Sequence, residues 1–229
     1  FCTQITALVF HFDHKNIREG TYSYNSAMVG VAIGVFYQFN LSLLVLLIIA
    51  SVLAFFVTIW YFNQLAVKGL PFLSIPFLLV TWLIIIGGKN FSALELQEKS
   101  VFTLVAFYPQ LFENTTNFIA ALPFADVMFL YFRSLGAILF QYNDLAGVII
   151  SIGILLNSRI SFVLSIYGFV LGFLFYRFME ADFSHLIYSY IGFNFILTSI
   201  ALGGFFIVAS KRSFLLLLFV IPLIALVIS

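Results

Sequence analysis

Charged side chains are scarce in this sequence. Only 8% of its 229 residues are Asp, Glu, Lys or Arg, whereas soluble globular domains contain about 25%. Hydrophobic residues make up 63% of the chain. A soluble protein of this size cannot bury so much apolar surface, but a bilayer can solvate the outer faces of apolar helices. The composition therefore predicts an integral membrane protein and excludes an ordinary soluble domain.

Several other features are missing. The single cysteine, Cys2, has no internal disulfide partner and no metal-ligand spacing around it. No basic tract suggests nucleic acid as a partner, and no nucleotide-binding loop suggests a cofactor. His11, Asp13 and His14 lie in one polar loop without further ligands nearby, so we predict no metal site. The chain begins at Phe1 and ends inside an apolar run, so we expect an internal piece of a longer protein.

Long apolar runs dominate what is present. Barrel strands would alternate apolar and polar residues, and these runs do not, so they predict seven or eight helical membrane segments in an all-α fold. Short charged stretches separate them, but basic residues flank both ends of the segments and leave the orientation open. The runs are 41–60, 70–87, 145–156, 160–176, 186–208 and 213–228, with a further one at 117–141 that Pro123, Asp126 and Arg133 interrupt.

Part of the sequence recurs. Residues 13–34 align without a gap with residues 182–203, so that Asn25 matches Asn194 and Asp13 matches Asp182 at an offset of 194 − 25 = 169. Repeated halves in one membrane chain are typical of transporters and channels. At this offset the counterpart of the segment 70–77 falls near position 239, beyond the last residue, and the counterpart of 140–143 falls before the first.

Two segments depart from ordinary apolar helices. In 70–77 (LPFLSIPF), Pro71 and Pro76 remove backbone donors and predict a broken helix, which is tolerated at membrane depth where it lines a watery path. Ser74 lies between the prolines. A kinked structural helix, with Ser74 bonded to its own backbone, is the alternative.

The second segment is 131–147 (YFRSLGAILFQYNDLAG). Asn143 is a good N-cap and Asp144 suits the positive end of the following helix. The pattern predicts a short helix that enters the membrane and stops before a full span, and a plain loop between two spans is the alternative. For Asn25 and Asn194 we favour a structural role as helix-packing hydrogen bonders.

Four blocks of the sequence together resemble the urea transporter family, in its bacterial type. They match the family in order and spacing across essentially the whole chain, and the second is the most specific. The blocks are TYSYNSAMVGVAIG at 21–34, GLPFLSIPFLLVTWL at 69–83, FRSLGAILFQYNDLAGVIISIGIL at 132–155 and IGFNFILTSIALG at 191–203.

The resemblance implies a fold of two inverted repeats of transmembrane helices with re-entrant helices, and a pore between the repeats. Residues 1–116 would be the later part of repeat one, with 88–116 as a connecting segment. Residues 117–229 would be the earlier part of repeat two. Three protomers would form a homotrimer with a pore in each.

The resemblance also implies which side chains line the substrate pore. Ile138 and Phe140 come from the re-entrant helix of repeat two. Met28 and Leu197 take the aliphatic wall position in the two repeats, again at 197 − 28 = 169. Ser74 takes the place of the mid-pore threonine and keeps its hydroxyl.

The chain also departs from the family pattern at four positions. Ala137, the sixth residue expected at the pore, stands where the family usually has Gln or Glu. Ser74 replaces threonine, Asp144 replaces the usual proline, and Phe195 stands where glycine usually follows the asparagine. The missing polar group at position 137 bears on the substrate more than on the fold.

The implied function is passive diffusion of urea, or of a similar small neutral amide, through a multi-pass protein of the bacterial inner (plasma) membrane. Its partners would be the solute, membrane lipid and further copies of the chain. Ala137 keeps open a pore of the same fold for another small neutral solute, and a non-transporting structural membrane protein is a further alternative. A membrane enzyme is disfavoured, because no convergent cluster of His, Asp, Ser or Glu is expected at membrane depth.

Overall fold

The computed structural model describes residues 1–96, 109–120, 124–141, 143–181 and 191–228. Much of the connecting segment 88–116, as well as Pro123, Asp182 and the start of the 186–208 run, lies outside the described residues. The chain divides into two units, Phe1–Val101 and Phe102–Ser229, each with its own internal packing. Each unit is described separately below.

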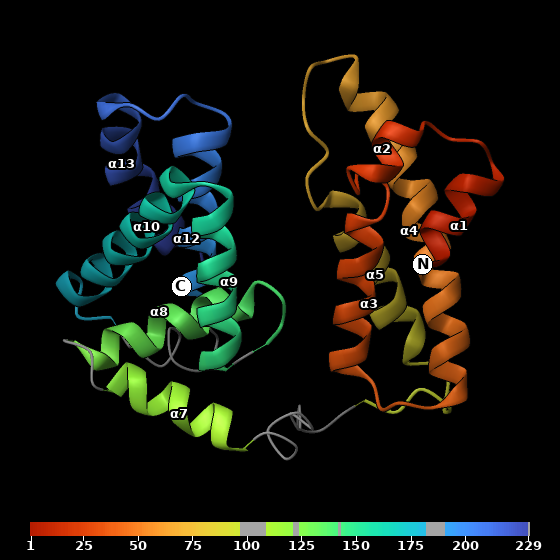
Figure 1. The fold of residues 1–229 in the computed structure, drawn as a ribbon, viewed down its shortest axis with the longest axis horizontal. Coiled ribbons are helices and arrows are strands. Elements are labelled where there is room, and N and C mark those ends of the chain that lie inside the picture. Colours follow the sequence, from red (N-terminus) through yellow and green to blue (C-terminus); the bar gives the residue numbers. More distant parts are fainter. Residues whose placement is uncertain (97–108, 121–123, 142, 182–190, 229) are drawn as a thin grey trace. The chain divides into compact units, whose positions relative to one another are not determined.

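All regular elements in the described residues are helices, as the apolar runs predict. Unit 1 contains α1 (Cys2–Val9), α2 (His14–Arg18), α3 (Tyr24–Phe36), α4 (Leu41–Ala66) and α5 (Ile75–Gly88) (Figure 1). Unit 2 contains α7 (Pro109–Ala120), α8 (Ala125–Ala137), α9 (Asp144–Asn157), α10 (Arg159–Phe178), α12 (Gly192–Ile200) with its π-helical continuation η1 (Ala201–Phe205), and α13 (Lys211–Ile228).

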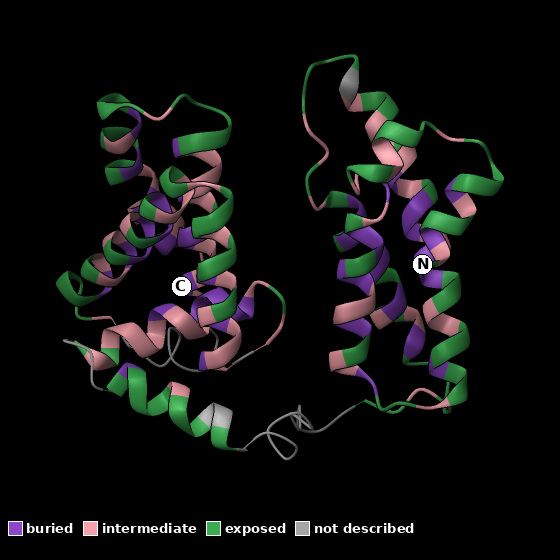
Figure 2. Cartoon of the chain, viewed as in Figure 1, coloured by how far each residue is buried: buried purple, intermediate pink, exposed green. Residues whose placement is uncertain are grey.

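Three helices are long and apolar enough to cross a membrane. They are Leu41–Leu65 within α4, Arg159–Phe178 and Lys211–Ile228, and only 33%, 33% and 22% of their most apolar windows are buried. Figure 2 shows buried residues on one side of each helix and exposed residues on the other. Because the exposed sides are apolar, lipid rather than water is the solvent that suits them.

The remaining apolar helices are shorter than the sequence predicts. The run 70–87 becomes helical only at Ile75, and the run 117–141 is divided between α7, which ends at Ala120, and α8, which begins at Ala125. The helices α3, α5, α9 and α12 with η1 are apolar but have fewer than 18 residues each. The predicted seven or eight membrane segments thus comprise three long helices and several short ones.

Helix boundaries recur at the offset found in the sequence. The helix α3 spans 24–36, and α12 with η1 spans 192–205, so their starts differ by 192 − 24 = 168 and their ends by 205 − 36 = 169. The next helix begins at Leu41 in unit 1 and at Lys211 in unit 2, a difference of 211 − 41 = 170.

The recurrence extends to a helix end that the sequence comparison did not reach. The helices α1 and α10 end at Val9 and Phe178, with 178 − 9 = 169. Two residues later, His11 (φ 54°) and Glu180 (φ 50°) both take the left-handed conformation. The amide of the following residue then bonds back five positions in both places, from 12 to 7 at 2.9 Å and from 181 to 176 at 3.0 Å. This is the Schellman helix stop, and it is formed at matching positions of both units.

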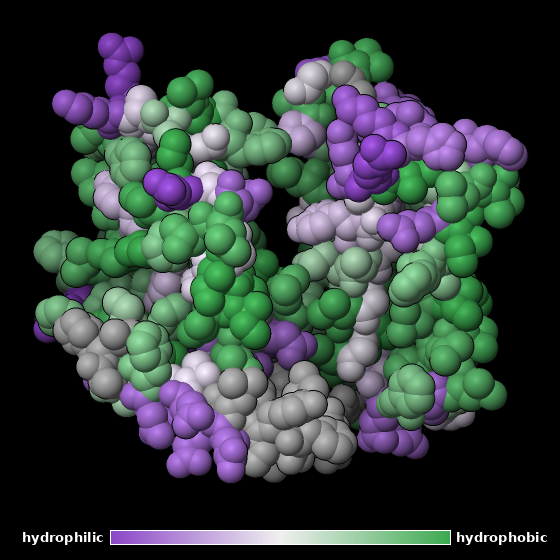
Figure 3. Space-filling model, in the orientation of Figure 1, coloured by the Kyte–Doolittle hydropathy of each residue, from purple (hydrophilic) through white to green (hydrophobic). Residues whose placement is uncertain are grey.

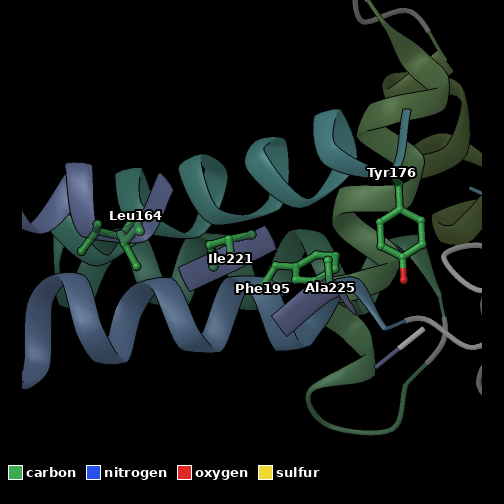
Figure 4. Packing of buried hydrophobic residues seen from close by; sticks show 6 residues of the cluster. Leu164, Tyr176, Phe195, Ile221 and Ala225 are labelled. Atoms are coloured by element: carbon green, nitrogen blue, oxygen red, sulfur yellow. The ribbon is translucent and has the colours of Figure 1, made fainter. Parts of the chain in front are cut away.

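The core of unit 2 is built where α10 crosses α12 and α13. Leu164, Tyr176, Phe195, Ile221 and Ala225 form one buried cluster there (Figure 4). Gly168 and Gly172 form a small-xxx-small pair on α10, and a Cβ at Gly172 would overlap the ring of Phe195. Close helix crossing through such a pair is the usual packing of membrane helices.

Unit 1 packs through aromatic rings instead. Phe12, Tyr22 and Phe55 contact one another edge to face, with ring centroids 5.4–6.0 Å apart. Phe55 is fully buried on α4, and Ala7 of α1 belongs to the same cluster. The two units therefore hold their long helices by different means.

Candidate functional site

The predicted break at 70–77 is confirmed. Residues 70–74 are not helical, Leu73 is left-handed with φ 47°, and α5 begins directly after Ser74. Pro71 lies in the non-helical part. Pro76 lies in the first turn of α5, where the missing N–H would have no intrahelical partner in any case. The two prolines therefore place the start of α5 rather than kink a longer helix.

Asn25 holds this start from a different helix. Its side chain is completely buried, its Nδ2 donates to the carbonyl of Leu73 at 3.3 Å, and its Oδ1 accepts from the amide of Phe77 at 3.3 Å. The two backbone groups flank Ser74 on both sides. The structural role predicted for Asn25 is thus confirmed, and its bonds lie next to a predicted pore residue.

These two hydrogen bonds of Asn25, called the Asn25 clamp below, change the bonding of the Ser74 hydroxyl. Ser74 is the N-cap of α5, and an N-cap serine normally accepts from an amide two or three residues later. Here Asn25 takes the amide of Phe77, and Ser74 makes no side-chain cap hydrogen bond. The hydroxyl of Ser74 is half-buried and does not bond the backbone of α5 as the alternative requires, and that it faces a solute path stays a prediction.

Met28 lies one turn after Asn25 on α3 and is 8% exposed. Residues three apart share a helix face, and the Asn25 bonds show that this face is turned toward the start of α5. Unit 1 thus brings Met28 and Ser74 to one region.

In unit 2, Ala137, Ile138 and Phe140 lie where α8 stops. The amide of Phe140 bonds to the carbonyl of Ala137 and the amide of Gln141 to that of Gly136, both at 3.0 Å. This is again a Schellman stop, with Phe140 in the left-handed position at φ 58°. Glycine usually fills that position, and a residue with a Cβ costs about 1–2 kcal/mol there. Phe140 shares this conformation with His11, Leu73, Phe124 and Glu180 in the described part of the chain, and a role of its ring at the pore stays a prediction.

The turn is held between two helices. The side chain of Asn143 accepts from the amide of Ala146 at 2.7 Å, so its predicted N-cap role for α9 is confirmed. Gly147 on α9 lies so close to α8 that a Cβ there would overlap the carbonyl of Phe132. The short helix, the stop and the following helix therefore form a tight hairpin.

An ion pair closes this hairpin, and the sequence analysis did not find it. Arg133 Nε on α8 donates to Asp144 Oδ1 at 2.8 Å, and Asp144 is 8% exposed. The Arg133 guanidinium also lies over the ring of Phe129, 5.5 Å from its centroid. Asp144, which replaces the usual proline of the family, thus joins the start of α9 to α8.

The other predicted residues of unit 2 lie nearby. Ala137 is 5% exposed at the end of α8, and Ile138 packs against a cluster that contains Tyr131, Leu135 and Ile196. Leu197 follows Ile196 on α12 and is 42% exposed. The structure brings the end of α8 and the Leu197 helix together, whereas Met28 and Ser74 belong to the other unit.

The sequence does not indicate two further buried hydroxyls, one in each unit. Thr81 Oγ1 on α5 and Ser134 Oγ on α8 are buried without a hydrogen-bond partner in the described residues. Gly192, at the start of α12, packs on Ser134. Serine and threonine are common in helices, and no sequence signal marks these two.

The described residues contain no group of three or more His, Cys, Asp or Glu side chains able to hold a metal ion. The predicted site residues are a serine, a phenylalanine and four apolar side chains, divided between the two units. Side chains of this kind suit a neutral solute more than an ion.

The comparison with known families agrees with this chemistry. The urea transporter family model matches residues 1–229, the whole chain. No curated protein matches the chain. The chain therefore belongs to the urea transporter family, a family of channels rather than enzymes, and its function is the passive passage of urea across a membrane.

Proposed function

We propose that urea passes a slot formed by Met28 and Ser74 in the first repeat and by Ala137, Ile138, Phe140 and Leu197 in the second. The Asn25 clamp is the observation that carries this assignment, because it frees the hydroxyl at Ser74. The left-handed Phe140 supports the opposite wall, since the Schellman stop fixes the backbone from which its ring projects.

The proposed slot suits the chemistry of urea. Urea is neutral, so it avoids the large cost of bringing an ion into a low-dielectric passage. Removing its water still costs several kcal/mol unless its amide hydrogens meet acceptors. In the proposal the Ser74 hydroxyl is one such acceptor, and the flat ring of Phe140 admits a planar solute and excludes bulkier ones. The process needs no energy source.

Charge placement supports an inverted arrangement of the repeats. In unit 1, Lys15 and Arg18 follow α1, and Lys68 follows α4 at the same end of the unit (Figure 1). In unit 2, Arg159 and Lys211 lie where α10 and α13 begin. The opposite end of unit 2 carries Arg177, in the last turn of α10. With Arg212 beside Lys211, the end where α10 begins is still the more basic one of unit 2, whereas in unit 1 the more basic end is the one where α1 ends.

Cytoplasmic ends of membrane helices carry the excess of Lys and Arg. If both basic ends face the cytoplasm, α1 and α10 run in opposite directions, which is the relation expected of inverted repeats. Parallel repeats would put the two basic ends on opposite sides. We therefore assign the ends with Lys15 and Lys211 to the cytoplasmic side and the end with Lys89 to the other side.

The remaining parts of the proposal follow the resemblance to the family. Residues 1–116 form the later part of repeat one, including the connecting segment 88–116, and residues 117–229 form the earlier part of repeat two, with the pore between the repeats. Three copies form a homotrimer, each with its own pore, surrounded by the lipid of a bacterial inner membrane.

A swelling assay on proteoliposomes that contain the full chain tests the function. We expect rapid urea influx that Ser74→Ala slows and that Ser92→Ala, an exposed serine outside the proposed slot, leaves unchanged. Rapid entry of another small neutral solute with slow entry of urea would favour the alternative suggested by Ala137. No solute flux in a folded protein would favour a structural role.

A further inference from the structure

A groove of unit 2 lies between the starts of α10 and α13. It encloses about 790 Å³ and is lined along its walls by Val163, Tyr167, Phe214 and Leu215, with Arg159 and Lys211 at its rim. Val163 and Leu215 are 53% and 60% exposed. The apolar walls are therefore open to an occupant, and both helices are among those long enough to span the membrane.

The floor of the groove is fixed. The hydroxyl of Tyr167 on α10 donates to the carbonyl of Phe214 on α13 at 3.1 Å, and the two rings meet edge to face with centroids 5.0 Å apart. Tyr167 lies eight residues after Arg159, which corresponds to about 12 Å along a helix. The groove thus runs from a charged rim into the apolar depth of the same two helices.

The rim carries positive charge that the described residues do not neutralise. Arg159 and Lys211 are the first residues of their helices, Arg212 follows Lys211, and neither helix has an acidic residue in its first turn. The described part of the chain shows one ion pair, and it involves none of these three. The positive ends of both helix dipoles lie at the same rim.

Ser158 and Ser210 cap the two helices through the amides of Ser161 and Ser213, at 3.2 and 3.4 Å. The amides of the first two residues of each helix have no intrahelical partner. They add hydrogen-bond donors beside the cations.

We propose that this groove binds an anionic phospholipid of the surrounding leaflet, with its phosphate at Arg159 and Lys211 and one acyl chain along Val163, Tyr167 and Leu215. Charge complementarity selects the headgroup, and the apolar walls select a lipid over a free anion. The corresponding end of α4 in unit 1 begins with Leu41 and Ser42, so the cation at Lys211 is not repeated there. The proposal requires membrane embedding but not the assignment of the slot.

Native mass spectrometry of the full chain tests the proposal, with phosphatidylglycerol and phosphatidylcholine of identical acyl chains as probes. We expect preferential retention of phosphatidylglycerol. A basic residue near an anionic membrane surface contributes about fivefold to binding, so Arg159→Gln with Lys211→Gln should lower retention about 25-fold. Lys68→Gln, which removes an exposed basic residue after α4 that does not line this groove, is the control for charge alone and should lower retention less than Arg159→Gln or Lys211→Gln does.

A second pair of measurements separates the lipid from a free anion. Val163→Trp, which fills the groove without changing charge, should also lower phosphatidylglycerol retention, while excess inorganic phosphate should not displace the lipid. Circular dichroism confirms that each variant is helical. Equal retention of both lipids, an equal loss in Lys68→Gln, or displacement by phosphate would overturn the proposal.

Discussion

Asn25 and Asn194 stand 169 positions apart at the starts of matching helices, and their side chains do different things. Asn25 is fully buried and bonds two backbone groups of another segment, 48 and 52 residues away. Asn194 is half-buried, and its Nδ2 donates to the carbonyl of Ile191 three residues earlier at 3.2 Å. In the described residues Asn25 thus cross-links two segments and Asn194 bonds locally, while the counterpart of the segment that Asn25 bonds, near position 239, lies beyond the last residue. Local sequence sets where the helix starts, but the surroundings decide what the amide bonds.

A second difference between the units concerns volume. At the same offset Gly172 matches Thr3 and Phe195 matches Ser26, since 172 − 3 = 169 and 195 − 26 = 169. The ring of Phe195 is completely buried and occupies the space that a side chain at Gly172 would need. Unit 1 has two middle-sized polar residues at these positions, Thr3 and Ser26, both 4% exposed. A small residue packed against a large one in unit 2 thus corresponds to two middle-sized polar residues in unit 1.

Exchanging this pair should give the largest effect. We expect Phe195→Ser to cost about 3–5 kcal/mol as a large-to-small change in the core, and Gly172→Thr about 1–3 kcal/mol through overpacking. The double variant should cost less than the sum, because the threonine occupies part of the space that the ring leaves. A double-mutant cycle of thermal unfolding in detergent measures this coupling, and additive effects would contradict the volume exchange.

Removing the two asparagine amides should give effects of unequal size. Asn25→Ala removes two hydrogen bonds, to the carbonyl of Leu73 and from the amide of Phe77, and we expect this to cost about 1–3 kcal/mol even if Ser74 then accepts from that amide. Asn194→Ala removes one local bond of a half-buried side chain and should cost less than about 1 kcal/mol. Thermal unfolding of the two variants side by side provides the measurement. Equal losses would show that the two asparagines play the same role after all.

The sequence predicts where some of the helices begin, but not the hydrogen bonds and ion pairs that join one helix to another. Two prolines around Ser74 predict the break before α5, and the cap at Asn143 is recognisable because asparagine before a small-residue helix is a local signal. The Asn25 clamp joins segments about 50 residues apart, and the Arg133–Asp144 pair joins two helices across a turn. Such bonds depend on how helices pack, which no local pattern specifies.

The left-handed conformation of Phe140 illustrates the same limit. Sequence rules place glycine or asparagine at a Schellman stop, and the nearest asparagine, Asn143, lies three residues further on as the cap of α9. A helix end at Phe140 could therefore be predicted only approximately. The recurrence of helix ends at Val9 and Phe178 was also invisible in the sequence, because the residues there do not resemble one another.

Phe140 itself allows backbone strain and ring function to be separated. Phe140→Ala removes the ring and keeps the strained conformation, whereas Phe140→Gly removes both, so the glycine variant should be the more stable by about 1–2 kcal/mol. If the ring forms a pore wall, both variants should weaken discrimination between urea and a bulkier amide to the same extent. Swelling rates for the two solutes, measured beside the melting temperatures, decide this. A lowered melting temperature in both variants with unchanged selectivity would place the ring in the core instead.

The smallest change in stability is expected at Ser74, and it depends on Asn25. Because Asn25 already holds the amide of Phe77, Ser74→Ala should leave stability within about 0.5 kcal/mol of the parent. Its urea flux should nevertheless fall about three- to tenfold, which corresponds to one lost hydrogen bond of about 0.5–1.5 kcal/mol. In an Asn25→Ala background the amide of Phe77 no longer bonds Asn25, and the Ser74 hydroxyl can accept from it as an ordinary N-cap. Ser74→Ala should then cost about 1 kcal/mol, as the loss of a cap does. Thermal unfolding of the parent, the two single variants and the double variant therefore tests the Asn25 clamp. If Ser74 does not compete with Asn25 for the amide of Phe77, Ser74→Ala will have the same small cost with and without Asn25.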